Sequence, residues 1–217
     1  AMCVPDLLGS QGTFLLFTTR PEDEKFKEGG LRIGISSNGA GPDSFETAIE
    51  GPENPFRQDG APMTIPMKIE VDRAANRVRV DLDGETIERE PGVLSDWVTL
   101  TFTAGPGVTP TGLTRMMITD MDEHVSLYLT PISIDPDNPA MPISHPSYYA
   151  TYLAKKIGPF STLGLAEDTW ALNEGVTDDG TFLRQTYDID REREEMFFAS
   201  MEKLKSGSLV CVFDATD

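Results

Sequence analysis

Alternating apolar and polar residues between positions 67 and 90 constrain the fold of this chain more than any other sequence feature. Apolar residues occupy every second position on both sides of a possible turn: Ile69, Val71, Val78 and Val80. A period of two places such side chains on one face of a β-strand. The residues RAAN between the two runs can turn, and Asp83-Gly84 is a strong tight-turn signal. The segment therefore predicts consecutive antiparallel strands.

Turn-forming residues separate short alternating runs from about Gly12 to Leu129. The runs WVTLTFTA, LTRMMITDM and HVSLYLTPI continue the antiparallel meander, with one face on a core and the other in water. Residues 37–62 differ, because they are rich in Gly, Pro, Asn and acidic residues. We expect a long irregular excursion there, either a lid or a mobile loop.

Helical periodicity begins after Pro146, beyond a proline-rich connector. The run SYYATYLAKKIG starts with a serine cap and ends with two lysines and a glycine, which predicts a helix. Further helices are expected at about 165–173 and 179–205. The segment Leu209–Phe213 is apolar and rich in β-branched residues, which predicts a buried strand.

These elements predict an α+β chain, with an antiparallel β-rich cap or insertion region followed by helices and one strand of a truncated α/β core. The β-rich region is expected to cover residues 1–133, and the helical segment with its core strand to cover residues 134–217. A length of 217 residues suffices for one large domain or two modest ones.

Charge and hydropathy limit the partners of the chain. It contains 36 acidic and 18 basic residues, for a formal net charge of −18. Such a surface repels phosphate backbones, so nucleic acid is disfavoured as a main partner. An anionic small substrate stays open, because a local cation or metal reverses the field inside a cleft. The apolar runs are far shorter than a membrane span, so no span is expected.

The two cysteines, Cys3 and Cys211, lie far apart in the sequence. Cys211 falls within the apolar terminal run, so a buried free thiol is favoured over a disulfide. Neither a cytoplasmic nor an exported location follows from these residues.

Ser144–Pro146 places a serine beside a histidine, which invites comparison with a hydrolase nucleophile. Adjacent residues rarely bring nucleophile and base within reach, and no G-x-S-x-G elbow surrounds this serine. We expect an ordered turn that caps the following helix.

Asp120, Asp122 and His124 would share one face of a straight strand and could then bind a metal ion. A hairpin turn at residues 121–123 explains the same side chains without a metal, and this interpretation is favoured. Further along the chain, Trp170 lies among acidic residues, where a helix with a buried indole is favoured over a substrate platform.

Asp214 and Asp217 follow the predicted terminal strand directly. Acids just past a buried strand are either metal or catalytic residues or caps of a following helix, since α/β sheets place their chemistry at that edge. A polar tail or a frayed helix is a commoner end than a core strand. We therefore expect this chain to be an internal piece of a longer protein.

Four stretches resemble predicted phosphohydrolases/phosphomutases of the alkaline phosphatase superfamily, often labelled type I phosphodiesterase/nucleotide pyrophosphatase. They are MCVPDLLGSQGTF, PISIDPDNPAMPISHPSYYA, GLAEDTWALNEGVTDDGTFLRQTYDIDREREEMFFASM and LVCVFDATD. The likeness covers the first dozen residues and most of the second half. The β-rich middle resembles the family in the order of its segments.

The resemblance implies a metal-dependent phosphohydrolase acting on a phosphorylated small molecule. A histidine four residues beyond Asp217 would complete the Asp-x-x-x-His metal pair of the superfamily, with Asp217 as a ligand and Asp214 as a weaker candidate beside it. The divalent metal ions, zinc or manganese, would stabilise the attacking and leaving oxygens in phosphoryl transfer.

The resemblance also implies that this piece is inactive alone. The family's Thr or Ser nucleophile belongs upstream of the piece, and the later Asp-His pair and final histidine belong beyond Asp217. The piece would hold catalytic metal poorly, and its part would be to roof the active site and sort substrates. The alternative is a stand-alone, non-catalytic binding module whose terminal acids are surface charge.

Overall fold

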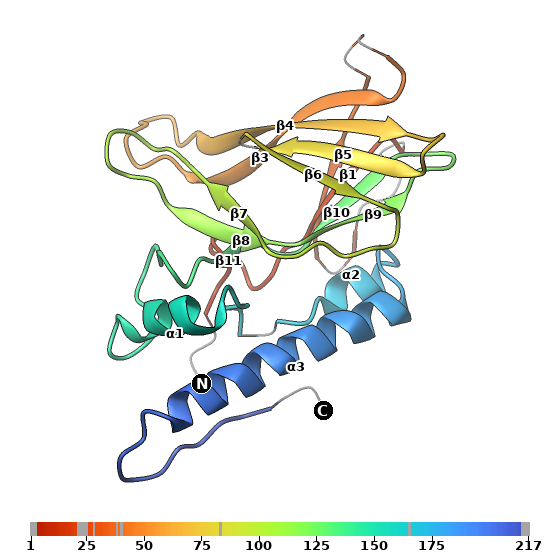
Figure 1. Ribbon diagram of the computed structural model, residues 1–217. Helices are drawn as coiled ribbons and strands as arrows, with labels where there is room; N and C mark the ends of the chain where they lie inside the picture. Colours follow the sequence, from red (N-terminus) through yellow and green to blue (C-terminus); the bar gives the residue numbers. More distant parts are fainter. Residues whose placement is uncertain are drawn as a thin grey trace.

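The computed structural model describes residues 4–20, 26–27, 29–37, 39, 41–82, 84–164 and 166–213. Within these residues the chain forms 11 strands and three helices, which confirms the α+β class. The strands together form what we call the β-rich body. It carries the helices on one side, and α3 (Asp179–Met201) runs along the outside of the helical layer (Figure 1).

The strands form three sheets, and every pair in the described chain is antiparallel except β1 with β2. The first sheet has the order β2-β1-β10-β9, from β1 (Leu15–Thr18), β2 (Leu31–Gly34), β9 (Met116–Asp120) and β10 (Ser126–Leu129). The second has the order β11-β8-β7, from β7 (Val98–Thr101), β8 (Thr111–Thr114) and β11 (Ser133–Ile134). The third has the order β3-β4-β5-β6, from β3 (Ser44–Glu53), β4 (Pro62–Asp72), β5 (Arg77–Leu82) and β6 (Glu85–Arg89).

The predicted hairpins form the third sheet. Ile69 of β4 lies opposite Val80 of β5, and both side chains are buried while their sequence neighbours are more exposed. The RAAN turn ends at Asn76, which has a φ of 53°, a conformation that asparagine adopts more readily than most residues. Apolar alternation and turn chemistry therefore confirm the predicted antiparallel strands.

Residues 37–62 are not the irregular excursion that the sequence predicts, because β3 occupies their centre. β3 pairs with β4, placing Phe45 opposite Ile69 and Ile49 opposite Ile65. The side chains of Phe45 and Ile49 are 3% and 0% exposed, so these two residues bury one face of the strand. The prediction was wrong because turn-forming residues at both ends of the segment outnumber the few apolar residues in its middle.

The main hydrophobic core lies between the three sheets and draws on all of them. It includes fully buried side chains from four strands: Phe17, Ile69, Leu100 and Leu127. Burial of each such side chain stabilises the folded chain by about 1.5–3 kcal/mol relative to leaving it exposed to water. A smaller cluster, with Phe14, Tyr128 and Ala171, joins the first sheet to α2 (Thr169–Asn173).

Three helices follow β11: α1 (Tyr149–Ile157), α2 (Thr169–Asn173) and α3 (Asp179–Met201). The starts of α2 and α3 have a clear cause, because the carboxylates of Asp168 and Asp178 accept hydrogen bonds from backbone N–H groups in the first turn. The three helices lie where they were predicted, although α2 begins later and α3 ends earlier than expected. The predicted serine cap at the start of SYYATYLAKKIG is wrong, because Tyr148 is the N-cap of α1 and its side chain makes no capping hydrogen bond. The division of the chain into two domains at residue 133 stays a prediction.

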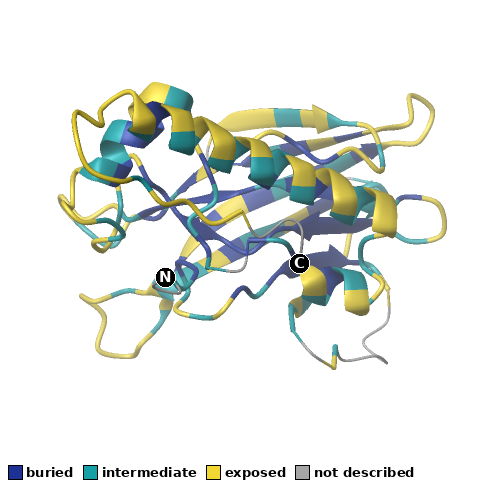
Figure 2. Ribbon diagram, turned by 90° about the horizontal axis from the view of Figure 1, so that it is seen from below, coloured by how far each residue is buried: buried dark blue, intermediate teal, exposed yellow. Residues whose placement is uncertain are grey.

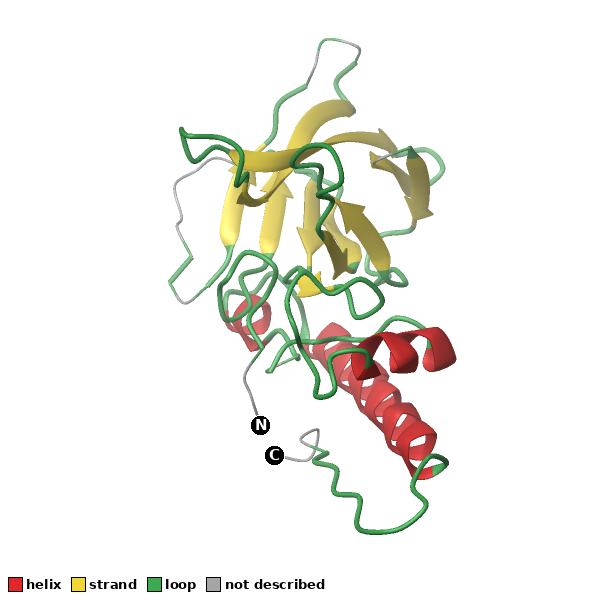
Figure 3. Cartoon of the chain, turned by 90° about the vertical axis from the view of Figure 1, so that its left-hand side faces the viewer, coloured by secondary structure: helices red, strands yellow, loops and turns green. Residues whose placement is uncertain are grey.

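Leu209–Phe213 does not form the buried strand that the sequence predicts. The segment is a loop that turns back beside α3 (Figures 1 and 3). Val210 and Val212 are 86% and 73% exposed, and Cys211 is an exposed free thiol rather than a buried one. A strand requires a neighbour that satisfies its backbone groups, and no described strand pairs with this segment.

Candidate functional site

The predicted metal ligands, Asp214 and Asp217, lie outside the described residues, as does Cys3. Their proposed roles therefore stay predictions. The described chain approaches them through Phe213, whose ring centroid lies 6.1 Å from that of Phe197 on α3.

Asp120, Asp122 and His124 lie at the turn between β9 and β10. Arg20 donates a hydrogen bond to Asp120 Oδ2 at 2.6 Å, and the Asp122 N–H donates to Asp120 Oδ1 at 3.0 Å. Burial raises the pKa of Asp120, but these hydrogen bonds outweigh it and lower the pKa below its ordinary value. The turn interpretation is confirmed, and the part of the chain that the structure describes contains no group of three His, Cys, Asp or Glu that could hold a metal.

The Ser144 hydroxyl organises the turn before α1. It lies 2.9 Å from the Pro146 carbonyl oxygen, to which it donates, and it accepts a hydrogen bond from the Ala150 N–H at 3.0 Å. The expected capping turn is confirmed, because this side chain satisfies a backbone donor in the first turn of the helix.

The strongest candidate site is a groove of about 380 Å³ between α3 and the β-rich body. Its volume is in the range of small-molecule sites. Seven charged or aromatic side chains line it: Asp96, Trp97, Arg115, Asp188, Arg191, Glu192 and Glu195. We call it the Trp97 groove.

Glu192 of α3 bridges the two walls of the Trp97 groove. Its Oε1 accepts a hydrogen bond from Trp97 Nε1 at 2.7 Å, and its Oε2 accepts one from the Ser161 N–H at 2.9 Å. Burial raises the pKa of Glu192, although both hydrogen bonds oppose that shift. The carboxylate is therefore held in place by the protein itself.

Arg115 of the β-rich body binds α3 beside this bridge. Its guanidinium donates to Asp188 Oδ2 at 2.9 Å and to the Ser95 carbonyl at 2.6 Å, and it lies 5.9 Å from the Trp97 ring centroid. Its side chain is only 12% exposed, so this ion pair is well shielded from water. The polar groups of the groove thus join helix to sheet, and the groove offers an indole edge and charged rims to a small polar ligand.

A second buried network lies beneath α2. Tyr128 donates a hydrogen bond to Asp168 Oδ2 at 2.6 Å, while Asp168 Oδ1 caps α2 and the Asp168 N–H donates to Gln185 Oε1. Burial raises the pKa of Asp168 to about 6. Such a carboxyl suits acid-base chemistry, but both oxygens already accept hydrogen bonds from the protein.

Sequence reasoning missed both networks. An aspartate immediately before an apolar helical run is a capping signal, so the position of Asp168 could have been found. No local pattern connects Trp97 with Glu192 or Arg115 with Asp188, because these partners lie 95 and 73 residues apart.

Trp170 is half-buried against the cluster beneath α2, and it also lines a small pocket of about 90 Å³ together with Asp168 and Thr169. A Cβ atom added at Gly29 would lie 2.1 Å from the indole Cε3. The close approach of the ring therefore requires glycine at this position, which agrees with a packing role for the indole.

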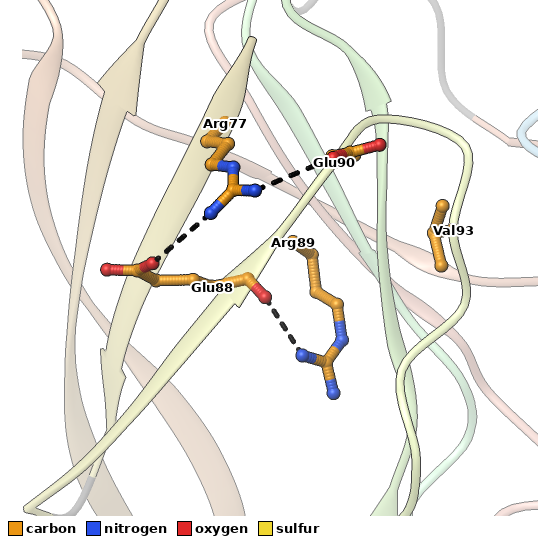
Figure 4. Close-up of a pocket in the computed structure, with 5 residues that line it drawn as sticks. All are labelled: Arg77, Glu88, Arg89, Glu90 and Val93. Atoms are coloured by element: carbon orange, nitrogen blue, oxygen red, sulfur yellow. Dashed lines mark hydrogen bonds and ion pairs between the residues drawn. The ribbon is translucent and has the colours of Figure 1, made fainter. Parts of the chain in front are cut away.

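A shallow surface pocket of about 250 Å³ lies over β5 and β6 (Figure 4). Arg77 lies 4.0 Å from Glu88 and 3.8 Å from Glu90, and Arg89 donates a hydrogen bond to the Glu88 carbonyl. The side chains of these ion pairs are more than half exposed, so the pairs are screened by water. This pocket is a solvated charged surface.

None of the helices in the described ranges has the length and apolarity needed to cross a membrane. Comparisons of the chain with protein-family models, with curated proteins and with solved structures gave no match.

Proposed function

We propose that this chain is the substrate-capping region of a metal-dependent phosphohydrolase of the phosphodiesterase/nucleotide pyrophosphatase kind, without hydrolytic activity of its own. One structural observation carries the proposal. Leu209–Phe213 has the composition of a core strand, yet its valines are exposed and it pairs with no described strand. The sheet of a catalytic domain would cover this segment, and Asp214 and Asp217 would follow it into the metal site.

The charge of the chain limits how it could serve such an enzyme. A net charge of −18 repels a phosphorylated substrate from the average surface. Zinc or manganese ions held by Asp217 and by ligands of the catalytic domain would reverse that field locally. The β-rich body would then act by position, as a roof that admits some substrates and excludes others.

The test compares the protein of the complete reading frame with the 217-residue chain. Both are assayed on p-nitrophenyl phosphate and bis(p-nitrophenyl) phosphate, with zinc or manganese. We expect the protein of the complete reading frame to show metal-dependent turnover and the 217-residue chain to show none. Asp217→Ala should lower the rate by at least about 100-fold, since the loss of even an outer partner of a metal ligand costs roughly 10–100-fold.

Asp59→Ala is the matched control, because the Asp59 side chain is 58% exposed on the β3–β4 loop, outside the Trp97 groove. It should leave the rate unchanged. Turnover by the 217-residue chain alone would overturn the proposal, as would an Asp217→Ala enzyme with the rate of the unsubstituted protein.

A stand-alone binding module is the second candidate, and the Trp97 groove favours it. Its volume of about 380 Å³ and its mixed charged and aromatic lining would suit a small polar ligand. The reading frame distinguishes the two candidates. A histidine four residues beyond Asp217 with a Thr or Ser nucleophile upstream supports the enzyme, and the absence of both supports the module.

A further inference from the structure

The outer face of α3 carries a row of apolar side chains that the described residues leave exposed. They are Leu183, Tyr187, Phe198 and Met201, with exposed fractions from 47% to 69%. Steps of three, four and eleven residues keep all of them on one side of a helix. Figure 2 shows much of this outward surface of α3 as exposed. Exposed apolar rows bordered by polar residues mark interaction surfaces. We call this row the α3 stripe.

Two opposite charges divide the α3 stripe at its centre. Arg191 and Glu194 are both exposed and lie between Tyr187 and Phe198. The midpoint of positions 187 and 198 is 192.5, and the midpoint of positions 191 and 194 is also 192.5. The stripe is therefore complementary to itself when a second copy runs in the opposite direction.

We propose that two copies of this chain associate through antiparallel α3 helices, with a two-fold axis near residues 192–193. Tyr187 then faces the partner subunit's Phe198, and Arg191 faces the partner subunit's Glu194, each pair occurring twice. Every contact occurs twice in a closed two-fold interface, because both copies use the same surface. The stripe from Leu183 to Met201 spans about 27 Å at a rise of about 1.5 Å per residue.

The neighbouring charges both favour and oppose this arrangement. Asp190 lies three residues after Tyr187 and four before Glu194, so it adds a negative charge to this side of α3, while Arg191 supplies the opposite charge. Glu195 lines the Trp97 groove on another side of α3. Arg191 lies at the rim of that groove, where it forms a salt bridge with Asp188. Arg191 itself is 66% exposed, so its guanidinium can also reach a carboxylate on a second copy. The inference does not rest on the proposed hydrolase function.

Sedimentation velocity of the 217-residue chain at increasing concentration tests the proposal. We expect a reversible dimer. Arg191→Glu and Glu194→Arg each place like charges opposite each other twice, so each should weaken dimerisation by at least about tenfold. The double variant R191E/E194R restores opposite charges at both contacts and should dimerise more tightly than either single variant.

Arg57→Glu provides the matched control, because Arg57 is a similarly exposed arginine paired with a nearby carboxylate on the β3–β4 loop. It should leave dimerisation unchanged, and circular dichroism should show that all variants keep the helical content of the unsubstituted chain. A chain that stays monomeric throughout would overturn the proposal. A double variant that dimerises no better than the single variants would also overturn it.

Discussion

Two carboxyl groups attach the helices to the β-rich body: Asp168, which is buried, and Glu192, which is partly buried. Burial raises the pKa of both groups above the ordinary range. An acid whose pKa is higher in the folded than in the unfolded chain stabilises the fold most below its unfolded pKa. That contribution is lost as the pH rises through the folded pKa. For Asp168 the window runs from the ordinary aspartate pKa of 3.8 to about 6.

Asp168→Asn should flatten this pH dependence. In the unsubstituted chain, the free energy of unfolding should fall by up to about 3 kcal/mol as the pH rises from 4 to 6, because Asp168 loses its proton less readily in the folded chain than in the unfolded chain. Asparagine caps a helix about as well as aspartate but does not titrate, so the variant should lose that slope. Urea unfolding at several pH values measures the effect.

The matched control is Asp178→Asn, at the start of α3. A hydrogen bond from the Thr181 N–H lowers the pKa of Asp178, so its stabilising contribution is present above pH 3.8 and is lost as the pH falls through the folded pKa. This substitution should leave the slope between pH 4 and pH 6 intact. An Asp168→Asn variant with the same slope as the unsubstituted chain would contradict the interpretation.

Gly29→Ala should disturb the packing of Trp170, because the new Cβ atom would overlap the indole ring. We expect a loss of about 1–3 kcal/mol in the free energy of unfolding and a change in tryptophan fluorescence. Gly41→Ala is the control, since a Cβ atom there meets no atom within 4 Å. Equal losses for the two variants would show that the contact with Trp170 is not the cause.

At the scale of elements, β3 and Leu209–Phe213 depart from the sequence expectation in opposite directions. β3 was expected to be a loop because its apolar residues are few, yet pairing with β4 and burial of Ile49 make it a strand. Leu209–Phe213 has strand composition but no strand partner in the described chain. Strand formation depends on a neighbour, which local composition does not supply.

Val210→Asp should change the free energy of unfolding of this chain by no more than about 0.5 kcal/mol, because the side chain is 86% exposed. Val80→Asp places the same carboxylate in the core of the third sheet, where it should cost about 3 kcal/mol or more. Guanidinium unfolding of both variants tests this contrast. Similar losses would mean that Leu209–Phe213 is packed within the chain.

At the scale of the whole molecule, the excess of acidic residues should oppose compactness. With a net charge of −18, raising NaCl from about 20 mM to about 300 mM should raise the thermal midpoint at pH 7, because salt screens the repulsion. Near the sequence pI of about 4.4 the increase should vanish. A midpoint that falls with salt at pH 7 would show that attractive ion pairs dominate.

The candidate site was less predictable than the fold. The motifs at Asp120 and Ser144 were correctly assigned to turns, because their neighbours supply the turn chemistry. The Trp97 groove was missed, since its members come from the body and from α3 and only folding brings them together. The terminal acids, Asp214 and Asp217, stay predictions.

The sequence by itself determined the hairpins of the third sheet and the start of α3, because alternation, turn residues and acidic residues at a helix start act over a few neighbouring positions. Tertiary structure alone decided that residues 44–53 form a strand, that residues 209–213 do not, and that Glu192 meets Trp97. These outcomes depend on partners distant in the sequence, and the free energy of burial and pairing is realised only when those partners are present.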